Sequence, residues 1–152
     1  MSIMRRFVLV LCSVWTLVAC YVESRKVTIN GLVVGDKYSS EQIFKVCGTP
    51  DSQEVTEDGV TVARYGQSAL YFTDILWGAD IRDCSLTLCD CINVGTKRAE
   101  LNNLGTEIPL GTEGMNYWSP NFLPDSQRDG YLIMIEIDSL DVVSSISVQV
   151  SI

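Results

Sequence analysis

Cysteines are the residues whose type and spacing could most directly do chemistry. Beyond Cys20 the chain carries Cys47, Cys84, Cys89 and Cys91. An even number of cysteines in an oxidising compartment favours disulfides, and four cysteines allow three connectivities. Direct bonding of Cys89 to Cys91 would close a small, strained ring. Free thiols and a four-thiolate zinc site are the alternatives, but the sequence lacks the paired C-x2-C spacing of zinc sites, so we assign no metal ligand.

Histidine is absent from the sequence, which removes Ser-His and Cys-His catalytic pairs and histidine metal ligands. Carboxylates such as Asp58, Asp129 and Asp138 stand in turn-like stretches, where their ordinary role is turn formation. The sequence contains no phosphate-binding or dinucleotide-binding motif. We therefore expect no catalytic residue, no enzyme activity and no cofactor, although a carboxylate pair formed only in space would escape this reasoning.

Aromatic residues are better candidates for a functional surface. Tyr65, Tyr71, Trp77, Tyr117 and Trp118 gather in the strands and loops of the middle of the chain. Core filling is the alternative, because aromatic side chains most often serve cores. Trp77 and Trp118 stand in or beside loop-like stretches, however, and exposed tryptophans are typical interface anchors. We expect all five residues to bind a partner, with the two tryptophans as the main anchors.

The N-terminus has the pattern of an export signal. Arg5 and Arg6 precede an uncharged apolar stretch, residues 7–19, which is too short to span a bilayer, since spanning takes roughly 20 residues. Leu17 is too bulky for an ordinary secretory cleavage site. We expect residues 1–19 to be a signal peptide that is removed from the mature protein.

The residues Leu17-Val18-Ala19-Cys20 resemble the bacterial lipobox, in which Leu stands three positions before an obligatory Cys. In such signals the Cys thiol receives a diacylglyceryl group, the chain is cut before the Cys, and the new amine is acylated. The resemblance implies that Cys20 is lipidated and anchors the chain to a membrane, because two or more acyl chains bind stably. Residues 20–26 then form a short polar tether.

Acidic residues outnumber basic ones, 19 to 11, and loss of the signal peptide removes two arginines and no acid. Nucleic-acid binding needs clustered Lys and Arg, so this balance disfavours a nucleic-acid partner. It equally disfavours electrostatic docking on anionic lipids.

Two stretches with similar patterns follow the tether. In the first, Ser39 and Gln42 form a capping-box pattern before a helix that Gly48 ends. In the second, residues 97–104 have helical spacing and Gly105 ends them. Strand-like runs follow each helix: residues 53–56, 60–65, 68–73 and 81–91 in the first, and 115–118, 131–137 and 142–150 in the second, with 74–80 expected as a connection.

This pattern predicts an α+β fold made of two tandem helix-plus-antiparallel-strand units, with the helices packed on one face of an antiparallel sheet. We expect one domain, residues 27–152, with repeat-like halves at 27–91 and 92–152. Chance similarity between two amphipathic segments is the alternative.

Several short motifs of the first half are similar to those of the SmpA/OmlA lipoproteins, which include the BamE-type subunit of the outer-membrane protein assembly machinery. The motifs are Val34-Gly35, Ser40–Ile43, Cys47–Asp51, Arg64–Gly66 and Leu70–Asp74. A tandem copy of such a unit is similar to the β-lactamase inhibitor protein fold. The second half departs from the pattern, because Gly105-Thr106-Glu107 replaces the Gly-x-Pro ending. The resemblance implies a lipid-anchored α+β protein that binds other proteins.

We therefore expect a non-catalytic protein-binding or assembly module, lipid-anchored in the bacterial cell envelope at the outer membrane, whose partner is another envelope protein. One alternative is a secreted or anchored enzyme inhibitor of the β-lactamase-inhibitor-protein type, for which a membrane anchor would be superfluous. Another is a small envelope enzyme or carbohydrate-binding protein, which a pocket of converging carboxylates would favour.

Overall fold

The computed structural model describes residues 26–112, 115–120, 123 and 130–151. The expected signal peptide, the lipidation site Cys20 and the tether up to residue 25 lie outside the described residues. Within the described part, the helices are all too short or too polar to cross a membrane.

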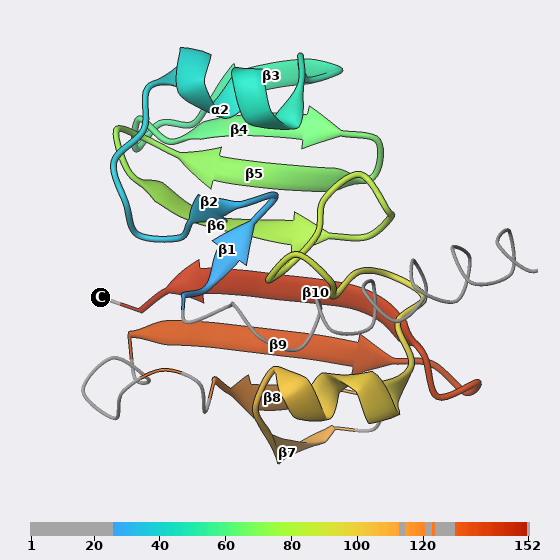
Figure 1. Cartoon of the computed structure of the whole chain (residues 1–152). Helices are drawn as coiled ribbons and strands as arrows, with labels where there is room; N and C mark the ends of the chain where they lie inside the picture. The colour runs from blue at the N-terminus through green and yellow to red at the C-terminus, as the bar shows by residue number, and fades with distance from the viewer. Residues whose placement is uncertain (1–25, 113–114, 121–122, 124–129, 152) are drawn as a thin grey trace, which may run out of the picture.

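Eight antiparallel strands form one sheet that holds most of the described chain (Figure 1). Their order is β3-β4-β5-β6-β10-β9-β8-β7, so two four-stranded meanders meet where β6 pairs with β10. The strands are β3 (Ser52–Val55), β4 (Thr61–Tyr65), β5 (Ser68–Phe72), β6 (Leu76–Ile81), β7 (Thr106–Thr112), β8 (Met115–Ser119), β9 (Tyr131–Ile137) and β10 (Val143–Val150).

Three small elements cover one face of this sheet, the face toward the viewer in Figure 1. They are the α-helix α2 (Ser40–Cys47), the hairpin of β1 (Thr28–Ile29) and β2 (Leu32–Val33), and the 3-10 helix η1 (Arg98–Asn103). The hydrophobic core lies between them and the sheet, and its largest fully buried side chains include Trp118, Phe72, Ile29 and Ile43. Removal of this apolar surface from water is the main stabilising term.

The first predicted helix is confirmed together with its caps. The Ser39 hydroxyl accepts a hydrogen bond from the Gln42 amide at 3.2 Å, and the Gln42 side chain accepts one from the Ser39 amide at 2.9 Å. Gly48 ends the helix with φ +85°. Ile43 is fully buried, whereas Phe44 is half-buried and packs edge-on against Phe72, with ring centroids 6.1 Å apart. Helix α2 therefore adheres to the sheet chiefly through Ile43.

The predicted fold class is wrong, because the described chain is mainly β-structure rather than two helix-plus-strand units. Helix α2 has eight residues, and the second predicted helix, residues 97–104, forms only the 3-10 helix η1. Asn102 and Asn103 are poor helix formers and stand directly before Leu104-Gly105, so this segment is too short to nucleate an α-helix. The pairing of β6 with β10 makes one continuous sheet, not separate units.

The strand boundaries around Gly78 are also corrected. The predicted connection, residues 74–80, contains most of β6, and the predicted strand 81–91 leaves the sheet after Ile81. Gly78 lies inside β6, where it allows the close pairing of β6 with β10. A Cβ at position 78 would collide with the carbonyl oxygen of Val148 and lie 2.9 Å from the Cα of Gln149. Glycine marks a close backbone approach here rather than a loop.

Candidate functional site: the open face of the sheet

Successive side chains of a strand point to opposite faces of its sheet, so the strand register assigns the residues of the uncovered face. In β5, Leu70 and Phe72 enter the core, whereas Ala69 and Tyr71 point away from it. We call this second face the open face, because the described helices and the β1–β2 hairpin all lie on the other side (Figure 1).

The register places one residue of every strand in a single row across the open face. In strand order the row is Ser52, Arg64, Ala69, Asp80, Ser147, Met134, Tyr117 and Ile108. Small or short side chains occupy its middle, and longer ones flank them. The middle of the face therefore lies lower than its flanks.

A hollow of about 230 Å³ lies at this position. It spans the junction of the two meanders, β6 with β10, and extends onto β9. Its lining residues are Asp80, Arg82, Met134, Glu136, Ser145, Ile146 and Ser147. The hollow thus combines two carboxylates, one guanidinium, two hydroxyls and a thioether on a surface that is open to solvent.

Each of the two carboxylates is held by one hydroxyl. Tyr71 Oη donates to Asp80 Oδ2 at 2.8 Å, and Ser145 Oγ donates to Glu136 Oε2 at 3.0 Å. Partial burial and the hydrogen bond to Asp80 raise the pKa of Tyr71 above its ordinary value. The described residues donate no hydrogen bond to the second oxygen of either carboxylate. Since a carboxylate can accept several hydrogen bonds, both retain capacity for a donor from outside.

The two arginines of the open face differ in their surroundings. Arg64 forms an ion pair with Glu54 at 3.1 Å, although both side chains are more than half exposed. Such a pair contributes roughly 0–1 kcal/mol. Arg82 is exposed beside the hollow, and among the described residues its guanidinium forms no ion pair. Arg82 thus lies at the hollow without a direct ion pair to Asp80 or Glu136.

The structure separates the five predicted partner-binding aromatics. Trp118 is 1% exposed and Tyr65 is 7% exposed, and both belong to the core, so the expected exposure of Trp118 is not found. Trp118 fills the core because β8 continues through it and its alternation points inward. Tyr65 donates a hydrogen bond to the carbonyl of Gly48 at 2.9 Å, which fastens β4 to the end of α2. Burial first, and the nearby Cys47 second, raise the pKa of Tyr65 to about 12.

The other three aromatics are half-buried and lie on or beside the open face. Tyr71 and Tyr117 lie on opposite sides of the hollow, on β5 and β8. Trp77 occupies the bulge between the pairs that β6 makes with β5, and its Nε1 donates to Thr73 Oγ1 at 2.9 Å. Tyr71, Tyr117 and Trp77 are thus the predicted anchors that the fold leaves accessible.

Cys47, Cys84, Cys89 and Cys91 are thiols in the structure. Burial raises the pKa of the Cys47 thiol, and a hydrogen bond with Asn30 opposes that rise. A raised pKa lowers the thiolate fraction and with it the reactivity of Cys47. In the described part of the chain, His, Cys, Asp and Glu side chains form no group of three or more that could hold a metal ion.

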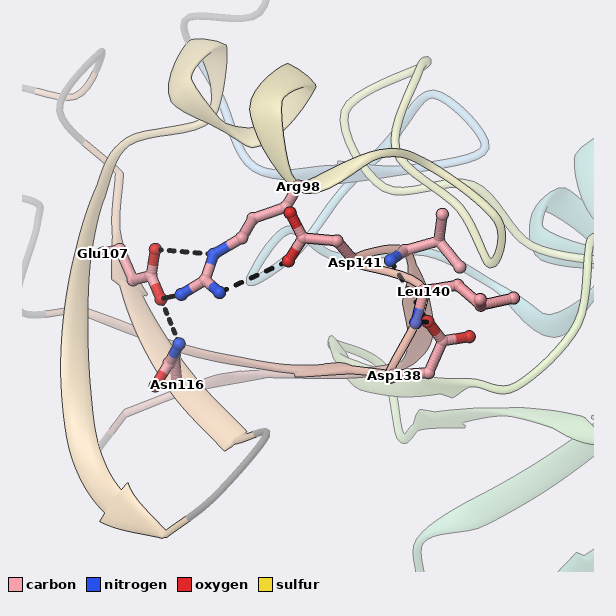
Figure 2. A network of polar contacts seen from close by, with 7 residues as sticks. Arg98, Glu107, Asn116, Asp138, Leu140 and Asp141 are labelled. Carbon is pink, nitrogen blue, oxygen red and sulfur yellow. Dashed lines mark hydrogen bonds and ion pairs between the residues drawn. The ribbon is translucent and has the colours of Figure 1, made fainter.

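A second polar cluster lies on the covered side of the sheet, near the edge that β7 forms (Figure 2). Arg98 of η1 donates to the Glu107 carboxylate of β7 and to Asp141 Oδ1 at 3.5 Å, and Asn116 of β8 also donates to Glu107. These contacts, chiefly that with Glu107, raise the pKa of Arg98. The cluster joins η1, the edge strand β7, its neighbour β8 and the β9–β10 turn, so we interpret it as structural.

Sequence reasoning missed Asp80, Met134, Glu136 and the other polar residues of the hollow. The alternation in residues 131–137 carries the signal, because Ile133, Ile135 and Ile137 are buried and Leu132, Met134 and Glu136 are not core residues. The alternation shows that β9 has a second face. It does not show that β6 lies two strands away, so only the register brings Asp80 to Glu136.

No family model matches the sequence, and no curated protein matches it. A solved structure of an extracellular protein containing an SCP domain, from Bacillus anthracis str. Ames, is similar to this chain with a TM-score of 0.47 and 15% sequence identity. The similarity covers 78% of this chain and 44% of that one, so the chain spans less than half the length of that protein.

Proposed function

We propose that this chain is a non-catalytic protein-binding module that binds another envelope protein through the open face of its sheet. The observation that carries the proposal is the open face, which no described helix or hairpin covers, with its central hollow and the accessible aromatics Tyr71 and Tyr117 on either side of it. Tyrosines that flank a polar hollow are anchors of the type found at protein interfaces, where polar groups fix the orientation of the partner.

The location belongs to the same proposal. The lipobox-like residues Leu17–Cys20 support lipid anchoring in the bacterial cell envelope, at the outer membrane. An enzyme inhibitor would use the same face, but a protein that diffuses to its target needs no anchor. In the anchored form, the tether holds the open face close to a partner in or at the same membrane.

A small enzyme or carbohydrate-binding protein is the second candidate, because Asp80 and Glu136 line one hollow. This candidate is weaker than protein binding for a chemical reason. Arg82 lines the same hollow as both acids, and the hollow is only partly enclosed. Chemistry on a substrate generally uses a site from which water is excluded.

Site-specific photo-crosslinking tests the open face. A benzophenone amino acid replaces Tyr117, which flanks the hollow on β8, or, as the control, Val46 on α2, which is 50% exposed on the other side of the molecule. In intact cells we expect a discrete protein adduct from position 117 and none from position 46. An adduct from position 46 alone would contradict the proposal.

Cys20→Ala tests the anchor. Without an acyl chain, the protein is expected to move from the membrane fraction to the soluble fraction, and the intact mass of the native chain should show a lipidated start at Cys20. A variant that stays fully membrane-bound would refute lipid anchoring without affecting the open face.

A further inference from the structure

The hollow of the open face differs from the rest of that face in its charge. Asp80 and Glu136 contribute two carboxylates to its wall, and Arg82 contributes one guanidinium. The hollow is therefore acidic by one charge, within a chain whose formal net charge is −8. An acidic recess on an acidic protein repels acidic side chains and attracts basic ones.

The hydrogen bonds of the hollow fix where a donor would be received. Tyr71 and Ser145 each occupy one oxygen of a carboxylate and hold it in place. The remaining oxygens of Asp80 and Glu136 accept nothing from the described residues, so they are oriented acceptors without a donor. Arg82 is the cation that lines the hollow with them, and it forms no ion pair with either carboxylate.

The other lining groups suit a long side chain with a polar end. Met134 offers a polarisable, adaptable apolar contact, and Ser147 offers a hydroxyl at the centre of the register row. The side chains of Lys and Arg have this form, with an aliphatic stem below a charged head. A volume of about 230 Å³ is large enough for the end of one such side chain.

We propose that the hollow is the receptor for one basic side chain, Arg or Lys, which the partner protein inserts between Asp80 and Glu136. This inference rests on the proposed function and specifies the chemistry of its partner. The stem packs on Met134, and the charged head donates hydrogen bonds to the carboxylates of Asp80 and Glu136. Tyr71 and Tyr117 flank the insertion point from β5 and β8.

A pair of matched peptides tests this chemistry directly. The probes are acetyl-Gly-Arg-Gly-amide and the same peptide with citrulline, which keeps the size and shape of arginine but carries no charge. Each is titrated into the full-length chain, and the amide signals of the hollow residues are followed by NMR. We expect saturable shifts at Asp80, Ser145 and Ser147, with arginine bound about tenfold more tightly than citrulline.

Three variants locate the effect. Asp80→Asn with Glu136→Gln keeps the hydrogen-bond acceptors but removes both charges, and it is expected to abolish the preference for arginine. Glu54→Gln, which removes a carboxylate already paired with Arg64, is the matched control and should leave the preference unchanged. Arg82→Gln removes the repelling cation and should tighten the binding of the arginine peptide.

Equal affinity for the two peptides, shifts elsewhere, or an undiminished preference in the double variant would overturn the proposal, as would weaker binding by Arg82→Gln. The outcome of the crosslinking experiment is independent of the outcome of the peptide titration. An adduct from position 117 without a preference for arginine would refute the basic side chain but keep the open face as a binding surface. Arginine preference without any adduct removes the protein partner instead.

Discussion

The same strands form both faces of the sheet, but large side chains are mostly buried on the covered face and stay accessible on the open face. On the covered face, residues such as Phe72 and Trp118 meet α2, the β1–β2 hairpin and η1, and their exposure falls to about zero. On the open face, the neighbours of those residues in sequence, Tyr71 and Tyr117, stay half-exposed and hold polar contacts. Burial thus differs between adjacent residues of one strand, so one substitution can change the stability of the fold and another the binding of a partner.

The largest expected effect comes from the adjacent pair Trp118 and Tyr117 of β8. Trp118→Ala should lower the free energy of unfolding by about 3–5 kcal/mol, because it empties a fully buried site. Tyr117→Ala, one residue away on the open face, should cost far less. Denaturant unfolding of both variants measures the difference. Equal losses would show that the two faces are not distinct, and would place Tyr117 in a core.

Helix α2 offers a second pair. Ile43→Ala should cost about 2–5 kcal/mol, because Ile43 is fully buried, whereas Phe44→Ala should cost less than removal of a fully buried Phe. The same unfolding measurement decides between them. A larger loss for Phe44 than for Ile43 would mean that α2 faces the sheet differently from the structure.

Substitution of Gly78 tests the pairing of β6 with β10, where the two meanders meet. Gly78→Ala forces β6 and β10 apart, because its Cβ meets the backbone of Val148, and should cost about 1–3 kcal/mol. Gly59→Ala, at a hairpin turn with φ +82° and open space around it, isolates backbone strain of about 1–2 kcal/mol. The crosslinking yield from position 117 should fall only in Gly78→Ala, since only this change disturbs the hollow. Unchanged crosslinking in Gly78→Ala would show that the hollow does not depend on the close pairing of β6 with β10.

The smallest effect concerns a polar cluster near the end of β6 and is read from the pH dependence of stability. The amide of Gln67, together with the hydroxyl of Ser68 and the amide of Ser85, donates to the carboxylate of Asp83 and lowers its pKa to about 2. In the unfolded chain an Asp has a pKa of about 3.9. The stabilisation is therefore fully present above about pH 4 and is lost as the pH falls towards 2.

Asp83→Asn is the control for this dependence. Unfolding measured between pH 5 and 2 should give a shallower pH dependence for the variant than for the native chain. Parallel curves would mean that the pKa of Asp83 is the same in the folded and the unfolded state. The open face should not be involved, so binding of the arginine peptide is expected to be the same in both proteins at pH 7.

Local patterns gave the parts of the fold that depend on a few neighbouring residues. The capping box of Ser39 and Gln42 fixes the start of α2, and residues 131–137 coincide with β9. The elements whose bounds were predicted wrongly depend on contacts between residues that are far apart in the sequence. β6 was misread because Gly78 is unfavourable in an isolated strand and becomes favourable only against β10. The candidate site was missed for the same reason, since Asp80 and Glu136 belong to strands that β10 separates.

The sequence by itself determined the export pattern, the acidic balance, the absence of histidine and the alternation that gives each strong strand two faces. These properties depend on composition or on residues close together in the chain. Only the tertiary structure decided that Trp118 faces inward while Tyr117 does not, and that small residues meet at the centre of the open face. The physical reason is that strand order and register are set by burial across the whole sheet, and a hollow formed by separate strands has no signature in any one of them.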